Sequence, residues 1–147
     1  MKRALISLLV LVTTFTMLAV PVSAAVPEND LVMPCYEHVQ SHEFNFYVTS
    51  AGQLCVVVNY RGTPSTFTQA KITVEIEKRF LGIFWTTVEI GYPDDLWIEY
   101  STDVNGTFTK TFASDGTGTY RATIKLEISG MYGADDVIEK EIQCEYN

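Results

Sequence analysis

Short runs in which apolar and polar residues alternate make up most of the chain after residue 35. In the clearest run, Tyr120–Ile128, every second side chain is apolar and the intervening ones are polar or charged. A period of two places such side chains on opposite faces of a β-strand. Beyond the N-terminal region, no run of ten or more residues has helical spacing. The pattern predicts an all-β fold, a single antiparallel β-sandwich of about seven strands.

The last strand, about Val137–Tyr146, is predicted to form a hairpin with Tyr120–Ile128. The register that places Leu126 opposite Ile138 also places Lys125 opposite Glu139 on the outer face. Exposed cross-strand pairs of this kind contribute roughly 0.2–1 kcal/mol each. We therefore interpret these charges as setting the register and keeping the surface soluble.

A second hairpin is predicted around the loop Leu81–Ile83, which contains a glycine. A three-residue loop places Ile76 opposite Val88 and Val74 opposite Ile90, so one face of the hairpin stays apolar. A two-residue loop would mix apolar and charged residues on each face. Three-residue hairpin loops commonly hold a glycine at positive φ, which favours the first register.

The same register divides the aromatic residues of this hairpin between two faces. Phe80 and Phe84 are predicted to face each other in the core, whereas Trp85 points outward, opposite Arg79, in a cation–π pair. The alternative is that a loop or an edge strand covers Trp85, or that a bulge turns it inward. Small exposed apolar patches on a protein tend to mark contact sites. The candidate binding residues are Leu81, Ile83, Trp85 and Arg79.

Two other segments carry turn signals. Ala51-Gly52 is predicted to be the turn of a first hairpin between the strands around residues 44–48 and 54–60. Asn105-Gly106 is also a turn signal. A two-residue turn there would pair charged residues with phenylalanines, so we expect a longer loop or a crossing between the two sheets.

The N-terminus has the three parts of a secretory signal peptide. Lys2 and Arg3 precede the apolar run Leu5–Val20, and Val22-Ser23-Ala24 supplies the small residues before a cleavage site. We predict cleavage after Ala24, an extended leader over residues 25–34, a single domain over residues 35–147, and an extracellular location. A retained membrane anchor fits less well because the apolar run is short for a span. No later stretch is apolar enough to span a membrane.

The charge balance limits the classes of partner. The chain has 18 acidic and 10 basic residues and a net charge of −8. A chain this acidic, without a basic cluster, is a poor ligand for nucleic acid or for an anionic membrane surface. Positively charged or neutral partners stay open, and we expect an extracellular protein or a glycan. No sequence feature indicates a cofactor.

Groups that could perform catalysis or bind a metal are sparse. The two histidines, His38 and His42, lie in a stretch that alternates like a strand, which would separate them by roughly 13 Å. We therefore expect solvated surface histidines and no metal site. The acidic pairs Asp94-Asp95 and Asp135-Asp136 follow glycine-containing stretches and could cap loops, bind calcium weakly or have no role. No G-x-S-x-G motif occurs.

These absences favour a non-catalytic binding module, and we predict no catalytic residue. An envelope-associated structural protein is the alternative. A small secreted hydrolase that uses His38 or His42 ranks last.

Part of the chain resembles immunoglobulin-like domains. The run Gly118-Thr119-Tyr120-Arg121-Ala122 is similar to the Gly-x-Tyr-x-Cys run of strand F, with Ala122 in place of the cysteine. Cys55 lies on a strand that resembles strand B, so the usual B–F disulfide is not available. The resemblance implies that Tyr120 is a structural tyrosine-corner residue.

Five short motifs of the chain carry a second resemblance: M33-P-C-Y36, G52-Q-L-C55, I72-T-V-E-I-E-K-R79, W85-T-T-V88 and G118-T-Y-R121. In these residues the chain resembles a family of small secreted proteins of unknown function from Gram-positive bacteria of clostridial type. This resemblance implies a compact β-sandwich and no established activity. Three cysteines permit three pairings, and the sequence does not choose among them. The resemblance suggests a Cys35–Cys144 disulfide and a buried Cys55 thiol, because only Cys55 matches a cysteine common in the family.

Overall fold

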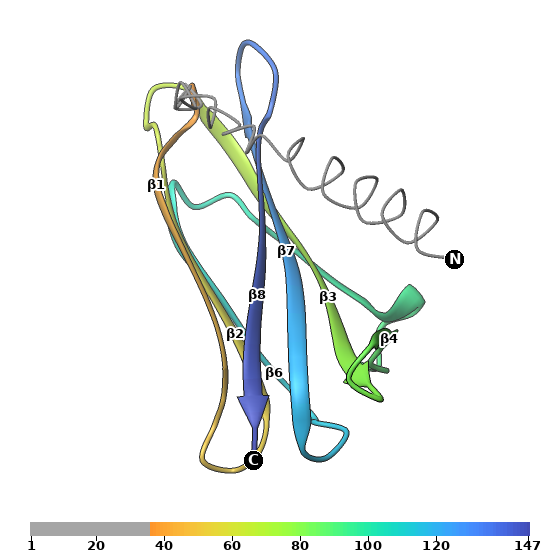
Figure 1. Cartoon of the computed structure of the whole chain (residues 1–147). Coiled ribbons are helices and arrows are strands. Elements are labelled where there is room, and N and C mark those ends of the chain that lie inside the picture. Colours follow the sequence, from red (N-terminus) through yellow and green to blue (C-terminus); the bar gives the residue numbers. More distant parts are fainter. Residues whose placement is uncertain (1–35) are drawn as a thin grey trace, which may run out of the picture. The chain divides into compact units, whose positions relative to one another are not determined.

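Eight strands form two antiparallel sheets in residues 36–147, the part of the chain that the computed structural model describes (Figure 1). This confirms the predicted all-β sandwich. The predicted signal peptide, the leader and Cys35 lie outside the described residues. The elements are β1 (Val39–Val48), β2 (Leu54–Gly62), β3 (Phe67–Phe80), β4 (Phe84–Thr87), the short 3-10 helix η1 (Pro93–Asp95), β5 (Leu96–Ser101), β6 (Asn105–Phe112), β7 (Gly118–Gly130) and β8 (Asp136–Tyr146).

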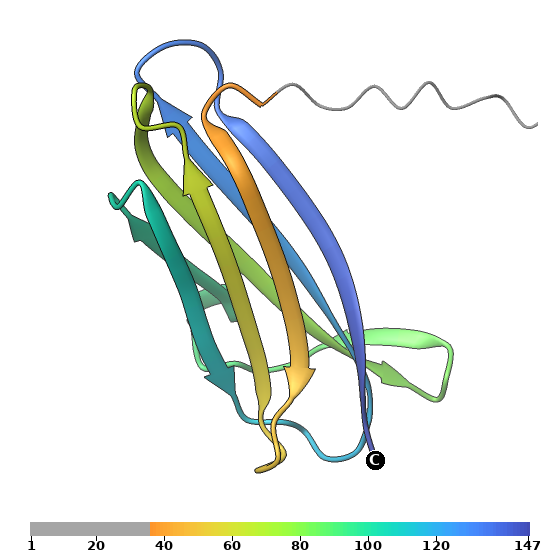
Figure 2. The same ribbon diagram turned by 90° about the vertical axis from the view of Figure 1, so that its left-hand side faces the viewer.

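One sheet has the strand order β1-β2-β6, and the other has the order β4-β3-β7-β8. Strand β5 also pairs with β3, along Ala70–Glu75 of β3. Strand β4 pairs with the C-terminal end of β3, along Glu77–Phe80. The sheet of β1, β2 and β6 lies in front of β3 and β7 of the other sheet in Figure 2, so the two sheets form two layers. Val74 is opposite Trp97 of β5, so the predicted Val74–Ile90 pair is wrong.

The chain crosses from one sheet to the other between β5 and β6, as the sequence suggested. Asn105 and Gly106 do not form a turn, because they are the first two residues of β6. Gly106 lies against the ring of Tyr60, and a Cβ atom there would come within 2.6 Å of the Tyr60 hydroxyl oxygen. The glycine is needed because β6 passes directly beside this ring.

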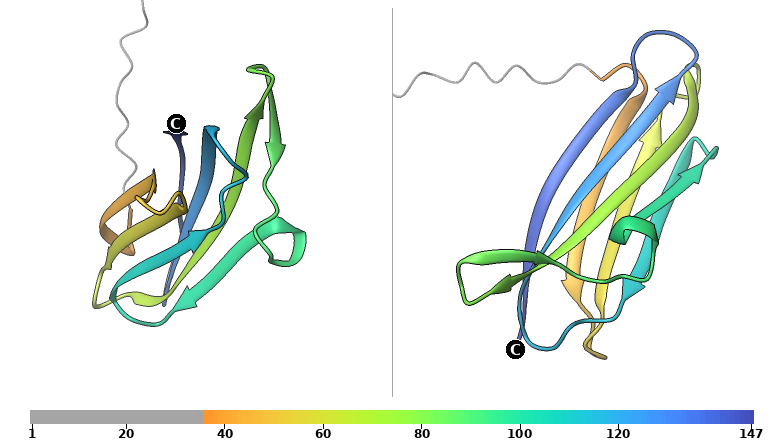
Figure 3. Two further views of the ribbon diagram at one scale, coloured as in Figure 1. Left: turned by 90° about the horizontal axis from the view of Figure 1, so that it is seen from below. Right: turned by 90° about the vertical axis from the view of Figure 1, so that its right-hand side faces the viewer.

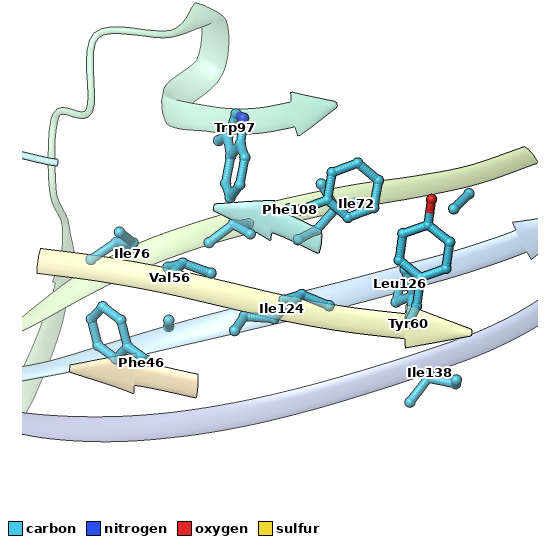
Figure 4. Packing of buried hydrophobic residues seen from close by; sticks show 14 of the residues in the cluster. Phe46, Val56, Tyr60, Ile72, Ile76, Trp97, Phe108, Ile124, Leu126 and Ile138 are labelled. Carbon is cyan, nitrogen blue, oxygen red and sulfur yellow. The ribbon is translucent and has the colours of Figure 1, made fainter. Parts of the chain in front are cut away.

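The core lies between the two sheets and is filled from alternate positions of the strands (Figure 4). Ile72 and Ile76 of β3 and Ile124 of β7 are fully buried. Trp97 of β5 is 1% exposed, and its ring meets Phe112 of β6 edge to face at 5.8 Å. Buried aromatic pairs of this geometry stabilise a core beyond their buried area.

The β7–β8 hairpin has the predicted register. Leu126 is opposite Ile138, and Lys125 is opposite Glu139. The Lys125 ammonium nevertheless contacts Glu127 of its own strand at 3.0 Å, and Lys71 of β3 contacts the same carboxylate at 2.8 Å. The hydrogen bond from Lys71, and then that from Lys125, lowers the pKa of Glu127 below its ordinary value.

Tyr120 occupies a structural position at the start of β7. Its side chain is fully buried, and its hydroxyl donates a hydrogen bond to the carbonyl oxygen of Gly116, four residues upstream. This contact gives Tyr120 a structural role, as the resemblance implied. The contact fixes the loop between β6 and β7 against the second sheet.

The carboxylate of Asp136 holds the start of β1 against β8. It accepts hydrogen bonds from the backbone N–H groups of Glu37, His38 and Val39, at 3.2, 2.6 and 3.0 Å. Asp136 is buried. Of the roles left open for the acidic pairs, Asp136 therefore has a structural one that joins the two ends of the domain sequence.

The prediction of two solvated histidines is wrong for His38. It is 1% exposed, and neither ring nitrogen has a hydrogen-bond partner among the described residues. The ring lies against Gly130, where any Cβ atom would collide with it. His42 is exposed, as expected, and its ring lies 5.4 Å from that of Phe44.

Candidate functional site

The β3–β4 hairpin extends beyond the body of the sandwich (Figure 3). Phe80 is opposite Phe84, so the loop has the three residues that the sequence predicted. The N–H of Ile83 donates to the carbonyl oxygen of Phe80 at 3.1 Å and closes the turn. Leu81 and Gly82 both have positive φ, of 51° and 71°. A left-handed backbone is costly for leucine, and strain of this kind concentrates at functional sites.

Four large apolar side chains cover the end of the hairpin, and we call them the hairpin tip. They are Phe80, Leu81, Ile83 and Phe84, with exposed fractions of 56, 74, 71 and 61%. The loop positions of Leu81 and Ile83 agree with the prediction. Phe80 and Phe84 were predicted in the core, and that prediction is wrong.

The exposure of Phe80 and Phe84 follows from the unequal reach of the strands. The last β3–β7 pair is Lys78–Tyr120, and β7 begins only two residues earlier, at Gly118. Phe80 therefore lies two residues past the last residue of β3 that pairs with β7, level with the first residue of β7. Its side chain has the orientation of a core residue, but no core continues beneath it.

Trp85 points outward opposite Arg79, which is the predicted register. The Arg79 guanidinium lies 5.9 Å from the indole centroid, and that of Arg121, on β7, lies closer, at 4.3 Å. Arg121 is itself fixed by Glu77 and Glu141, with N–O distances of 2.8 and 3.2 Å. The contact of Arg121 with Trp85 could not be predicted from the sequence, because it depends on the β3–β7 pairing.

A groove of about 440 Å³ runs between the hairpin and the β6–β7 loop. Lys78 lines it, together with residues 86–89 and 113–115. The Lys78 ammonium donates to the carbonyl oxygen of Asp115 and lies 5.6 Å from the ring centroid of Tyr120. The hydroxyl of Ser114 donates to the carbonyl oxygen of Gly52 at 2.6 Å. The polar groups of the groove thus hold the loop in place.

The two histidines lie apart from any cluster of metal-ligating side chains in the described residues. In residues 36–147, no group of three or more histidine, cysteine, aspartate or glutamate side chains is arranged to hold a metal ion. The ring of His38 is enclosed, whereas His42 lies on the surface of β1. Partial burial lowers the pKa of His42 below 6.5.

Cys55 and Cys144 form no disulfide within residues 36–147, and Cys35 lies outside the described residues. Cys55 is buried but is not a member of the core cluster. Its neighbours on β2, Leu54 and Val56, are members, so Cys55 lies on the face of the strand that points away from the core. Burial raises the pKa of Cys144 to about 11.

The predicted Cys35–Cys144 disulfide stays a prediction, because Cys35 lies outside the described residues.

In the described residues no helix has the length and apolar character needed to cross a membrane. No protein-family model matches the chain, and no match is found among curated proteins. The resemblance to secreted proteins of Gram-positive bacteria therefore stays a prediction. The functional proposal depends on the geometry of the β3–β4 hairpin.

Proposed function

We propose that this chain is a secreted, non-catalytic binding module that contacts an extracellular partner through the hairpin tip. One observation carries the proposal: Phe80, Leu81, Ile83 and Phe84 are each more than half exposed at the end of a projecting hairpin. Ten large apolar side chains are exposed in the described part of the chain, and four of them lie together at this tip. Exposed apolar patches mark interaction sites. The left-handed φ of Leu81 supports the same assignment, because an asparagine or glycine there would cost less.

The scaffold suits a binding role. The ladder between β3 and β4 and the buried core behind it support the tip on regular structure. Arg121 and Trp85 brace the outer face of the hairpin through their 4.3 Å contact. Rigid aromatic and aliphatic anchors bind partners at low cost in conformational entropy.

An immunoglobulin-like architecture is part of this proposal. The order β1-β2-β6 over β4-β3-β7-β8 parallels the two sheets of immunoglobulin-type sandwiches, and the Tyr120–Gly116 contact is a tyrosine corner. The departures are Ala122 at the strand-F cysteine position and the outward-facing Cys55. Such sandwiches commonly present binding residues on loops at one end.

A paired comparison of two variants tests the binding function. In the tip variant, Leu81→Ser and Ile83→Ser remove the aliphatic residues of the hairpin tip. In the control, Met131→Ser and Tyr132→Ser remove two equally exposed apolar residues from the β7–β8 loop. That loop lies at the opposite end of the sheet (Figure 1). Both variants are expected to stay within about 1 kcal/mol of the parent in unfolding free energy.

The readout is retention of the labelled protein on the surface of the producing cells and on extracellular matrix preparations. We expect the tip variant to lose at least tenfold in retention and the control to keep it. Equal retention of the two variants would contradict the proposal. Equal retention that also survives a salt wash would favour the alternative, an envelope-associated structural protein.

A further inference from the structure

The side chains of the β3–β4 hairpin follow an order of polarity along its length. Leu81 and Ile83 are at the end of the hairpin, and the aromatic pair Phe80–Phe84 comes next. The pair Arg79–Trp85 follows, and the carboxylates begin only at Glu77. Proteins that enter a bilayer place their side chains in the same order: aliphatic ones in the hydrocarbon, aromatic ones at its boundary and cationic ones at the level of the phosphates.

The charges on the hairpin contrast with those of the rest of the chain. Residues 78–88 contain two cations and no acidic residue, although the chain has 18 acidic residues. In the described part of the chain, Arg79 has no carboxylate within ion-pair distance, and Lys78 has only Asp115, at 3.8 Å. Arg79 is exposed and lies one residue behind Phe80, where lipid phosphates would meet it, whereas Lys78 is held by Asp115 in the groove.

The backbone of the hairpin tip tolerates an apolar environment. The Ile83 N–H and the Phe80 carbonyl oxygen are bonded to each other, and Phe80 pairs with Phe84 in the ladder. A closed turn therefore enters an apolar phase with few unsatisfied polar groups. The tip is also convex. A protein partner would have to offer a matching pocket, whereas a bilayer can take up the tip without a preformed pocket.

We propose, building on the proposed function, that the hairpin tip inserts into the interfacial layer of a neutral phospholipid bilayer, such as phosphatidylcholine. The four apolar side chains enter the acyl boundary, Trp85 lies at the level of the headgroups, and Arg79 contacts their phosphates. A neutral bilayer is specified because the chain carries a net charge of −8, which an anionic surface would repel.

The test uses the purified protein and phosphatidylcholine vesicles, in a flotation assay. We expect the parent and the Met131→Ser/Tyr132→Ser control to float with the vesicles, and the Leu81→Ser/Ile83→Ser variant to bind at least tenfold more weakly. Raising the salt concentration to 0.5 M should change the binding less than twofold, since apolar insertion is not screened. Circular dichroism melting curves establish that all three proteins are folded.

Tryptophan fluorescence gives a second readout of the insertion. Trp97 is 1% exposed in the core, so lipids that carry a quencher near the headgroup can reach only Trp85 of the two tryptophans. We expect quenching of Trp85 in the parent and none in the Leu81→Ser/Ile83→Ser variant.

Each outcome separates the lipid inference from the proposed function. If the parent does not float with the vesicles, or if all three proteins float equally, the lipid inference is overturned. If tip-dependent retention on cells persists in that case, a protein or glycan partner takes the place of the bilayer and the binding function stands. If cell retention is also independent of the tip, both proposals fail.

Discussion

Replacing Asp136 by asparagine tests how the start of β1 is held. The carboxylate accepts two N–H groups at Oδ2, from His38 and Val39, and a third at Oδ1, from Glu37. An asparagine side chain has nearly the same shape, but it carries one acceptor oxygen and no charge. If that oxygen takes the Oδ2 position, its NH2 group faces the N–H of Glu37 and one bond is lost.

The expected cost follows from these contacts. A hydrogen bond to a charged group contributes about 1.5–3 kcal/mol, and a neutral one contributes about 1 kcal/mol. Two bonds at Oδ2 would lose their charge assistance, and the longer bond from Glu37, which is partly exposed to water, would be lost. We expect Asp136→Asn to lower the free energy of unfolding by about 2 kcal/mol. Asp136→Ala removes every acceptor and should cost about 4 kcal/mol.

Urea denaturation measures this loss, with the fluorescence of the two tryptophans as the signal. The control is Asp135→Asn, which changes the adjacent, exposed carboxylate and should alter the unfolding free energy by less than about 0.5 kcal/mol. Hydrogen exchange adds a local readout, because the amides of His38 and Val39 should lose protection in the Asp136 variant.

A loss below about 0.5 kcal/mol in Asp136→Asn, with the His38 and Val39 amides still protected, would refute the reasoning. It would mean that water or another acceptor satisfies these N–H groups equally well. A loss equal to that of Asp135→Asn would point to the general effect of removing a negative charge. The carboxylate would then have no specific role in holding β1.

Three further predictions concern single side chains. Tyr120→Phe removes the bond to Gly116 and should lower the unfolding free energy by about 1 kcal/mol in urea; no change would argue against a tyrosine corner. NMR titration of the His42 imidazole should give a pKa below 6.5, and a midpoint above 6.5 would contradict this. Because burial disfavours the protonated imidazole, the contribution of His42 to the free energy of unfolding is complete above pH 6.5 and declines as the pH falls below that value. Cys144, with a pKa of about 11 against an ordinary 9.0, should hold about a hundredfold less thiolate at pH 8 than an ordinary cysteine, so that mass spectrometry of alkylated peptides finds it slow to react.

The registers of two hairpins could be predicted because alternation constrains both strands at once. In β7 and β8, only one of two adjacent registers matches apolar with apolar faces, and Leu126 does lie opposite Ile138. The same reasoning placed Phe80 opposite Phe84 and Trp85 opposite Arg79. A one-residue slip would invert every face, so a pattern of this kind specifies the register strongly.

Contacts between distant segments could not be predicted in this way. Asp136 is bonded to backbone N–H groups that lie 97 to 99 residues earlier, and a backbone donor has no sequence signal. His38 is enclosed because Gly130 leaves room for its ring. His38 lies in the bend just before β1, and the glycines against its ring, Gly130 and Gly133, come from the other end of the domain. The burial of a polar residue just outside a strand therefore cannot be assigned from the sequence pattern.

The hairpin tip shows why the same rule can succeed for the register and fail for burial. Alternation reports which face of a strand a side chain occupies, and it placed Phe80 and Phe84 on the correct face. Burial also requires a second layer opposite that face, which depends on where other strands end. Strand β3 continues to Phe80, whereas its last pair with β7 is at Lys78. The two phenylalanines that the pattern assigned to the core thus enlarge the apolar surface from two residues to four, and the proposed binding function depends on that enlarged surface.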